Sequence, residues 1–174
     1  IWVFYRKELT VTRLSDLAGK RIAVGEGGSG TKLLADTMLS ADGVHDGTMG
    51  TEYVAQGVHR AIESLKASDI DAAFFVLSAD SPVIHEMLLD DRVRLLSFER
   101  HHGYSRRYSY LKSVVLERGV VDLEHDLPRE PVKLVAPAAS LVATTDLHDA
   151  FIPLLVEAAS ETHRAGGLLT NARE

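Results

Sequence analysis

The residues whose types and spacing could do chemistry lie in one glycine-rich turn, Gly25-Glu-Gly-Gly-Ser-Gly-Thr31. Its four glycines let the backbone turn sharply and come close to another group without an intervening Cβ. Ser29 or Thr31 can cap a helix that begins here, and the free amides and positive dipole end of such a helix favour an anion. The turn is therefore either a plain strand-to-helix connection or a seat for an anionic ligand.

Known catalytic motifs do not fit this turn. Residues 27–31 lack the G-x-S-x-G frame of a nucleophile elbow, and Thr31-Lys32 stands where a Walker motif needs Lys followed by Ser or Thr. Residues 25–30 match G-x-G-x-x-G, but Glu26 would place a negative charge beside a pyrophosphate. No strand ending in an acidic residue follows about 20 positions later, where the ribose partner is expected. The sequence predicts no catalytic residue.

Metal and cofactor chemistry also lack a pattern. The eight histidines form no H-x-x-x-H or H-E-x-x-H pair, and the chain has no cysteine. Thiolate metal sites, disulfides and cysteine nucleophiles are excluded on this ground. We expect no metal and no cofactor.

The elements that must position the turn alternate along the chain. Apolar spacing predicts helices over residues 30–40, 58–65 and 83–88, and strands over 1–5, 22–24, 70–77 and 93–98. The nearly continuous apolar run at 70–77 is typical of a central strand covered on both faces. The order predicts an α/β fold, a three-layer α/β/α lobe with a mainly parallel sheet. In such sheets ligands bind beyond the carboxyl ends of the strands, where the turn would lie.

The remaining segments are less regular. We expect a glycine-rich loop at 42–51, a solvated basic loop at 100–107, strand-like segments at 132–136 and 141–143, and a last helix over 151–162 that ends at Gly166-Gly167.

Bulk composition is that of a globular domain: 174 residues, 45% apolar and 25% charged. The net charge of −6 gives no support to nucleic-acid binding, which needs clustered lysine and arginine. No run approaches the roughly 20 apolar residues of a membrane helix. Because Ile1–Tyr5 already looks like the middle of a strand, we expect a fragment of a longer chain.

Several strings resemble one family. Asp16-Leu-Ala-Gly-Lys-Arg-Ile-Ala-Val-Gly-Glu-Gly-Gly-Ser-Gly-Thr31, Ala61-Ile-Glu-Ser-Leu65 and Asp69-Ile-Asp-Ala-Ala-Phe-Phe75 look like TAXI-type solute-binding proteins of TRAP transporters, in the periplasmic binding protein type II class. Val132-Lys-Leu-Val-Ala-Pro-Ala-Ala-Ser-Leu-Val142 is similar to the strand that returns to the first lobe in that family.

The resemblance implies two α/β lobes that close over a small solute. Residues 1–11 would be the end of the first lobe and a crossing strand, residues 12–98 the second lobe, and residues 99–174 a crossing segment that returns to an incomplete first lobe. The protein would act outside the cytoplasm, in the periplasm, with or without a membrane anchor in the full-length parent.

The resemblance also implies ligand-binding residues. The Gly-Ser-Gly-Thr turn would contact the anionic group of the solute, two residues after the 70–77 strand would line the same cleft, and one tyrosine would approach from the hinge: Gly28, Ser29, Gly30, Thr31, Ser78, Ala79 and Tyr5. Glu26 and the 42–51 segment depart from the family pattern. Glu26 could favour a zwitterion that bears an amine.

The predicted function is a non-enzymatic solute-binding subunit that delivers a small organic anion or amino acid to membrane permease subunits. A ligand-sensing domain of a LysR-type regulator remains an alternative, which a helix-turn-helix segment upstream would favour. An enzyme on the same fold, similar to thiamine-pyrimidine synthesis proteins, is a further alternative, which turnover of a candidate substrate would favour.

Overall fold

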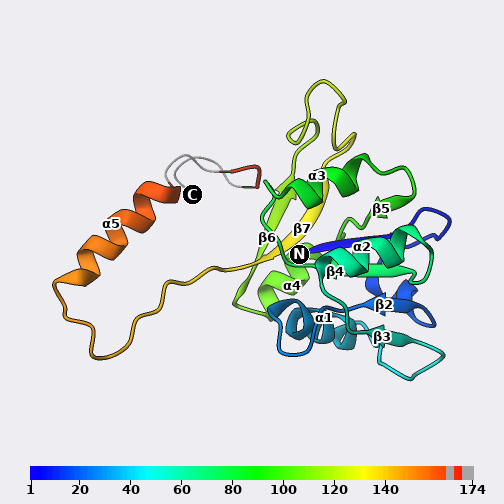
Figure 1. Cartoon of the computed structure of the whole chain (residues 1–174), viewed down its shortest axis with the longest axis horizontal. Coiled ribbons are helices and arrows are strands. Elements are labelled where there is room, and N and C mark those ends of the chain that lie inside the picture. Colours follow the sequence, from blue (N-terminus) through cyan, green and yellow to red (C-terminus); the bar gives the residue numbers. More distant parts are fainter. Residues whose placement is uncertain (164–166, 170–174) are drawn as a thin grey trace.

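The computed structural model describes residues 1–163 and 167–169 and contains a five-stranded sheet and a separate two-stranded hairpin (Figure 1). The strand order in the larger sheet is β3-β2-β4-β1-β5. Its strands are β1 (Trp2–Arg6), β2 (Arg21–Ala23), β3 (Glu52–Val54), β4 (Ala72–Phe75) and β5 (Val93–Leu95). The predicted α/β class is confirmed.

The sheet is mixed. β2 pairs in parallel with both β3 and β4, whereas β1 pairs antiparallel with both β4 and β5. β5 therefore points the same way as β4, and β1 alone runs against the other four strands. The expected parallel direction holds for those four, and β1 supplies both antiparallel pairings.

Helices cover both faces of this sheet. The connection from β2 to β3 and the connection from β3 to β4 cross the sheet in opposite directions. Right-handed crossovers therefore place α1 (Gly30–Ala41) on one face and α2 (Val58–Lys66) on the other, with α3 (Pro82–Leu89) beside α2 (Figure 1). All four residues of β4 are buried, as a strand covered on both faces requires. The predicted three layers are present.

The first strand lies inside this unit. β1 sits between β4 and β5, and its residues Trp2, Val3 and Phe4 are at most 1% exposed. The Phe4 and Phe75 rings meet edge to face, with centroids 6.2 Å apart. Residues 1–98 thus share one core, and the assignment of residues 1–11 to the end of another lobe stays a prediction.

The hairpin and a short helix pack against this unit. β6 (Leu111–Leu116) and β7 (Val132–Pro137) pair antiparallel, and α4 (His101–Arg107) contacts both strands. The expectation of a solvated loop at 100–107 was wrong: His101 and Tyr104 are buried, and the Tyr104 ring packs edge-on against Phe98 with centroids 6.0 Å apart. The neighbouring basic residues suggested an exposed loop, although two rings three positions apart, those of His101 and Tyr104, are buried.

Two further expectations differ from the structure. The 42–51 segment is irregular, as expected, but it leads into the unpredicted edge strand β3, which is only three residues long. The Thr51 side chain is buried and accepts the Gly19 amide at 2.8 Å, which helps to hold this edge in place. Residues 141–143 form no strand, and no segment among residues 1–163 and 167–169 pairs with them.

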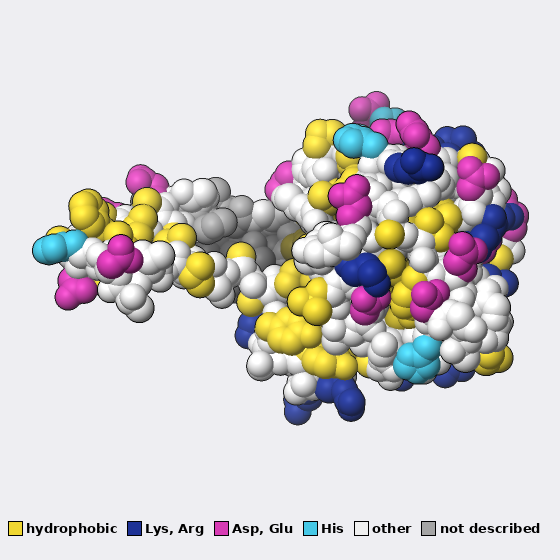
Figure 2. Space-filling model, turned by 60° about the horizontal axis from the view of Figure 1, so that its bottom comes forward, with side chains coloured by type: hydrophobic (Ala, Val, Ile, Leu, Met, Phe, Trp, Pro, Cys, Tyr) yellow, Lys and Arg dark blue, Asp and Glu magenta, His cyan; other side chains and the backbone are white. Residues whose placement is uncertain are grey.

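The last helix projects from the body. α5 (Phe151–His163) stands at the end of an extended segment, and Figure 2 shows apolar side chains along this arm. Its large apolar side chains are 37–59% exposed: Phe151, Ile152, Leu154, Leu155 and Val156. The helix itself was predicted, but Gly166, at its expected end, falls outside the described residues. None of the described helices is long and apolar enough to cross a membrane.

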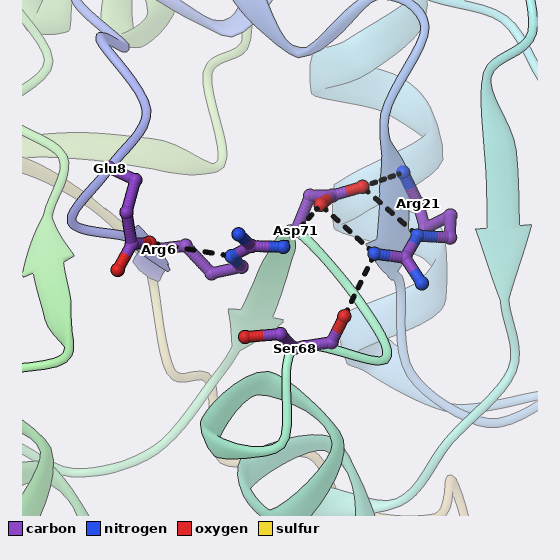
Figure 3. A network of polar contacts seen from close by, with 5 residues as sticks. All are labelled: Arg6, Glu8, Arg21, Ser68 and Asp71. Carbon is purple, nitrogen blue, oxygen red and sulfur yellow. Dashed lines mark hydrogen bonds and ion pairs between the residues drawn. The ribbon is translucent and has the colours of Figure 1, made fainter.

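An ionic network closes the end of the sheet where β4 begins. The Asp71 carboxylate accepts hydrogen bonds from the Arg21 amide at 2.9 Å and from its guanidinium at 3.1 and 3.2 Å, while Arg6 approaches at 3.3 Å (Figure 3). Burial alone would raise the pKa of Asp71, but the hydrogen bonds from Arg21 and the charges of both arginines lower it overall. This network ties β1, β2 and β4 together at the end opposite the glycine turn.

Candidate functional site

The glycine turn connects β2 to α1 in a conformation that only glycine adopts easily. Gly25 has φ +89°, and a Cβ there would lie 2.8 Å from the Thr31 Cβ and 2.9 Å from the Ser29 Oγ. Gly28 also has a positive φ, +80°, but no atom lies within 4 Å of the place its Cβ would take. The predicted turn is therefore real, and Gly25 is its sterically constrained position.

Ser29 begins the helix. Its hydroxyl donates to the Glu26 carbonyl at 2.7 Å and accepts the Lys32 amide at 3.1 Å, so it is the N-cap of α1. The amides of Gly30 and Thr31 come before Lys32 in the first turn, where no helix carbonyl precedes them as an acceptor. These two donors and the positive end of the helix dipole form the part of the turn that can hold an anion.

A small crevice lies beside this helix start. It has a volume of about 140 Å³ and is bounded by segments that follow β2 and β3 and by the end of β4. The lining residues are Gly25, Glu26, Ser29, Thr31, Gln56, Gly57, Val58, Phe74 and Phe75. The crevice therefore stands at the carboxyl ends of three parallel strands, the usual ligand position in an open α/β sheet.

A second helix also begins at the crevice. Gly57 is the N-cap of α2 and has no side chain to cap it, and the Glu26 carboxylate leans over this glycine. A Cβ on Gly57 would lie 2.8 Å from the Glu26 Oε1. A carboxylate beside a helix N-terminus is favoured by the helix dipole. Glu26 thus places its charge at the start of α2 and leaves the start of α1 open.

The crevice wall carries one charged side chain, and it is acidic. Lys32, which directly follows the turn, is held elsewhere: its ammonium lies 2.7 Å from Asp36 and 5.7 Å from the centroid of the Tyr53 ring. Gln56 adds a second acceptor to the wall. Its Nε2 donates to Ser64 Oγ at 3.1 Å, and its Oε1 is buried without a hydrogen-bond partner in the described part of the chain.

The structure brings some of the predicted site residues together. Ser29 and Thr31 line the crevice, and Gly28 and Gly30 belong to the same turn. Ala79 lines a different hollow, of about 590 Å³ beside α3, and the Ser78 hydroxyl lies 3.4 Å from the Asp80 amide in the turn before that helix. Ser78 and Ala79 thus follow β4 on the same edge of the sheet but outside the crevice.

Tyr5 lies away from the turn, and its place at the site stays a prediction. β1 runs antiparallel to β4, so Tyr5 pairs with Ala72 at the start of β4 and Trp2 pairs with Phe75 at its end. At about 3.3 Å per residue, three positions separate Tyr5 from the crevice end by roughly 10 Å. The indole Nε1 of Trp2 donates instead to the Leu77 carbonyl, at 3.0 Å.

Sequence reasoning missed the crevice residues that follow β3, namely Gln56, Gly57 and Val58. The signal was present, because Gly57 directly precedes a clear apolar helix pattern and is therefore a plausible N-cap. Without β3, however, nothing in the sequence indicated that this helix begins beside the glycine turn.

Another polar cluster stands apart from the crevice. The Asp42 side chain, 3% exposed, receives Arg100 and the Tyr104 hydroxyl beside a hollow of about 180 Å³. Burial and the Asp42 carboxylate raise the pKa of Tyr104. Because the buried charge is already paired, this cluster fixes α4 against the end of α1. Within residues 1–163 and 167–169, no three potential metal ligands come together.

The chain is similar to several binding proteins of known structure. One is the periplasmic aliphatic sulphonate binding protein SsuA from Escherichia coli, with 20% identity and a TM-score of 0.43 over 55% of this chain and 30% of that one. Another is the alkanesulfonate-binding SsuA from Xanthomonas axonopodis pv. citri bound to MOPS, with 20% identity and a TM-score of 0.46 over 62% of this chain and 39% of that one. A third is the substrate binding protein of an amino acid ABC transporter, with 14% identity and a TM-score of 0.47 over 96% of this chain and 55% of that one.

This chain therefore spans less than two thirds of the length of each of these three proteins. The TAXI type stays a prediction.

The family is settled by a match over nearly the whole chain. The model of the NMT1-like family matches residues 1–170, which include the glycine turn, every strand of the sheet and α5. The chain belongs to the NMT1-like family.

Proposed function

We propose that the protein is a solute-binding subunit that holds the anionic group of a small organic molecule at the start of α1. The observation that carries this proposal is the position of the Gly30 and Thr31 amides beside a crevice at the carboxyl ends of β2, β3 and β4. Two free amides and the helix dipole are suited to a carboxylate or sulfonate. The crevice residues perform no chemistry in this role: they bind and orient the solute.

The crevice alone is small and open, so we infer that a second lobe completes the cleft and closes over the solute. Binding would then shift an equilibrium between open and closed arrangements, since the ligand contacts both walls only when closed. We further infer delivery to TRAP-type permease subunits outside the cytoplasm, in the periplasm. The support for this finer assignment is the string from Asp16 to Thr31.

A thermal-shift screen of the full-length protein against carboxylates, amino acids and sulfonates tests the binding role. We expect stabilisation by at least one of them, because a ligand that binds only the folded state raises its melting temperature. Absence of stabilisation by every member of the panel would contradict the proposal.

A matched pair of variants then tests the position of the anion. Gly30→Pro removes one amide donor at the first helical position, where proline is well tolerated and where the preceding Ser29 already has the extended ψ of 152° that proline requires. Gly30→Ala keeps the donor, and no atom lies within 4 Å of its Cβ. We expect the proline variant to bind about 10 to 100 times more weakly, the value of one charge-assisted hydrogen bond, and the alanine variant to bind normally. Equal binding by both variants would place the anion elsewhere.

Transport by cells tests the permease assignment separately. Uptake of the identified solute should require both this protein and a large membrane protein encoded by a neighbouring gene. Uptake that persists when the protein is deleted would contradict the delivery role and leave the binding role standing.

A further inference from the structure

The charge of the crevice wall limits which solutes it can take. Among the residues that line it, Glu26 alone carries a charge, and no lysine, arginine or histidine of the described chain forms an ion pair with it. His59 and Arg60 line an adjoining hollow of about 650 Å³ together with Glu26, but neither forms an ion pair with it. Lys32 pairs with Asp36. A solute carrying only negative charge would therefore approach a carboxylate that no basic side chain pairs with, and this like-charge approach costs free energy in a partly enclosed site.

Glu26 is also held in place to meet a ligand. It belongs to the turn whose shape is fixed by Gly25, and its carboxylate rests against Gly57 at the start of α2. Since the Ser29 hydroxyl and amide both bond to the Glu26 carbonyl, at 2.7 and 3.1 Å, the backbone of this residue is anchored. The carboxylate lies at the start of α2, and it lines the same crevice as Thr31 in the first turn of α1.

The second acceptor on the wall adds to this pattern. Gln56 Oε1 has no donor within the described residues, and the terminal torsion of a glutamine side chain turns easily. A ligand group rich in N–H donors would serve both Glu26 and Gln56. The wall thus offers acceptors on one side and amide donors, at the start of α1, on the other.

We propose that Glu26 receives a protonated amine of the solute while the start of α1 holds its carboxylate, so that the site selects a zwitterion over a dianion. This inference rests on the proposed binding function and names the substrate class of the same site. The crevice ends against β4 at Phe74 and Phe75, which are at most 2% exposed. The specificity follows from matching one charge on each side of the crevice.

Isothermal titration calorimetry on the full-length protein tests the inference with solutes matched in size. The probes are 4-aminobutyrate, succinate and butyrate, together with alanine, malonate and propionate. Each set of three contains an amino acid, a dicarboxylate and a monocarboxylate without the amine. In at least one set we expect the amino acid to bind at least tenfold more tightly than the other two.

Two variants connect that preference to Glu26. Glu26→Gln removes the charge from an exposed side chain and should weaken zwitterion binding at least tenfold while leaving dicarboxylate binding unchanged or stronger. Glu63→Gln is the matched control, because it removes the same charge from an exposed position on α2 that does not line the crevice, and it should bind as the natural protein does. Gly57→Ala, whose Cβ would displace the Glu26 carboxylate, should reduce the preference without unfolding the protein.

The outcomes separate this inference from the proposed function. If a solute binds and Glu26→Gln takes zwitterions as tightly as the natural protein, the inference is overturned and the binding function stands. A preference for dicarboxylates in the natural protein overturns it as well. Failure of every solute to bind, in a wider panel too, overturns the binding function and this inference with it.

Discussion

Replacing Gly25 with alanine should destabilise the protein because two separate costs arise at this position. At φ +89° an L-residue is strained, by about 1–2 kcal/mol in the left-handed region. The added Cβ would lie 2.8 Å from the Thr31 Cβ and 2.9 Å from the Ser29 Oγ, and forcing a methyl group into such a space costs about 1–3 kcal/mol.

The two costs together predict a loss of about 2–5 kcal/mol in the free energy of unfolding. For a domain of this size that corresponds to a melting temperature lower by roughly 5–15 °C. Urea titration followed by circular dichroism measures the free energy, and a thermal scan measures the melting temperature.

Gly27→Ala is the control for this prediction. No atom lies within 4 Å of the Cβ position at Gly27, and its φ lies outside the positive region that strains L-residues. This variant should change the free energy of unfolding by less than about 0.5 kcal/mol, as surface substitutions usually do. Equal stability of the Gly25 and Gly27 variants would refute the described geometry of the turn.

Three further predictions concern the framework around the site. Asp71→Asn should lower the free energy of unfolding by about 1–3 kcal/mol, because the side chain is 14% exposed and its charged hydrogen bonds with Arg21 and Arg6 are lost. The pKa of Asp71 is lower in the folded state, so its contribution to the free energy of unfolding is present above its unfolded pKa and is lost as pH falls through its folded pKa. Urea titrations from about pH 6 to pH 2 should therefore show a smaller loss of stability in the variant than in the natural protein. Burial, with the charges of nearby aspartates, raises the pKa of Tyr53 to about 12. Its contribution to stability is therefore complete below its unfolded pKa and is lost as pH rises through the higher, folded value. A tyrosinate absorbance titration of Tyr53→Phe should lack one tyrosine ionisation step near this pKa, and an unchanged curve would contradict the burial of Tyr53. Ser29→Ala should cost about 1 kcal/mol through loss of the N-cap, measured by urea titration, while Ser29→Asn should keep most of that stability.

Local patterns in the sequence were sufficient for most elements of the sheet. The 3.6-residue spacing of Val58, Ala61, Ile62 and Leu65 marks α2 without any tertiary information, and the apolar run around β4 marks a strand covered on both faces. Strand β3 could not be found this way, because three residues at a sheet edge carry no period and are held by pairing with β2.

Only part of the candidate site could be predicted, because local patterns reveal one wall of the crevice and not the other. The turn from Gly25 to Thr31 is local in sequence, so its composition is enough to predict the start of the helix. The wall that faces it, at Gln56 and Gly57, depends on the pairing of β3 with β2, which no local pattern encodes. The position of Tyr5 relative to the turn depends on the antiparallel direction of β1, which is a property of the whole sheet.

The central claim is that the start of α1 is the anion seat of a solute-binding protein. Amide chemical shifts in nitrogen–proton NMR spectra, recorded while the solute identified by thermal shift is added, test this claim most directly. We predict that the largest changes occur at Gly30 and Thr31, with smaller changes at Gly57 across the crevice. Largest changes at Arg100 and Tyr104, beside the separate hollow near α4, with Gly30 and Thr31 unmoved, would contradict it.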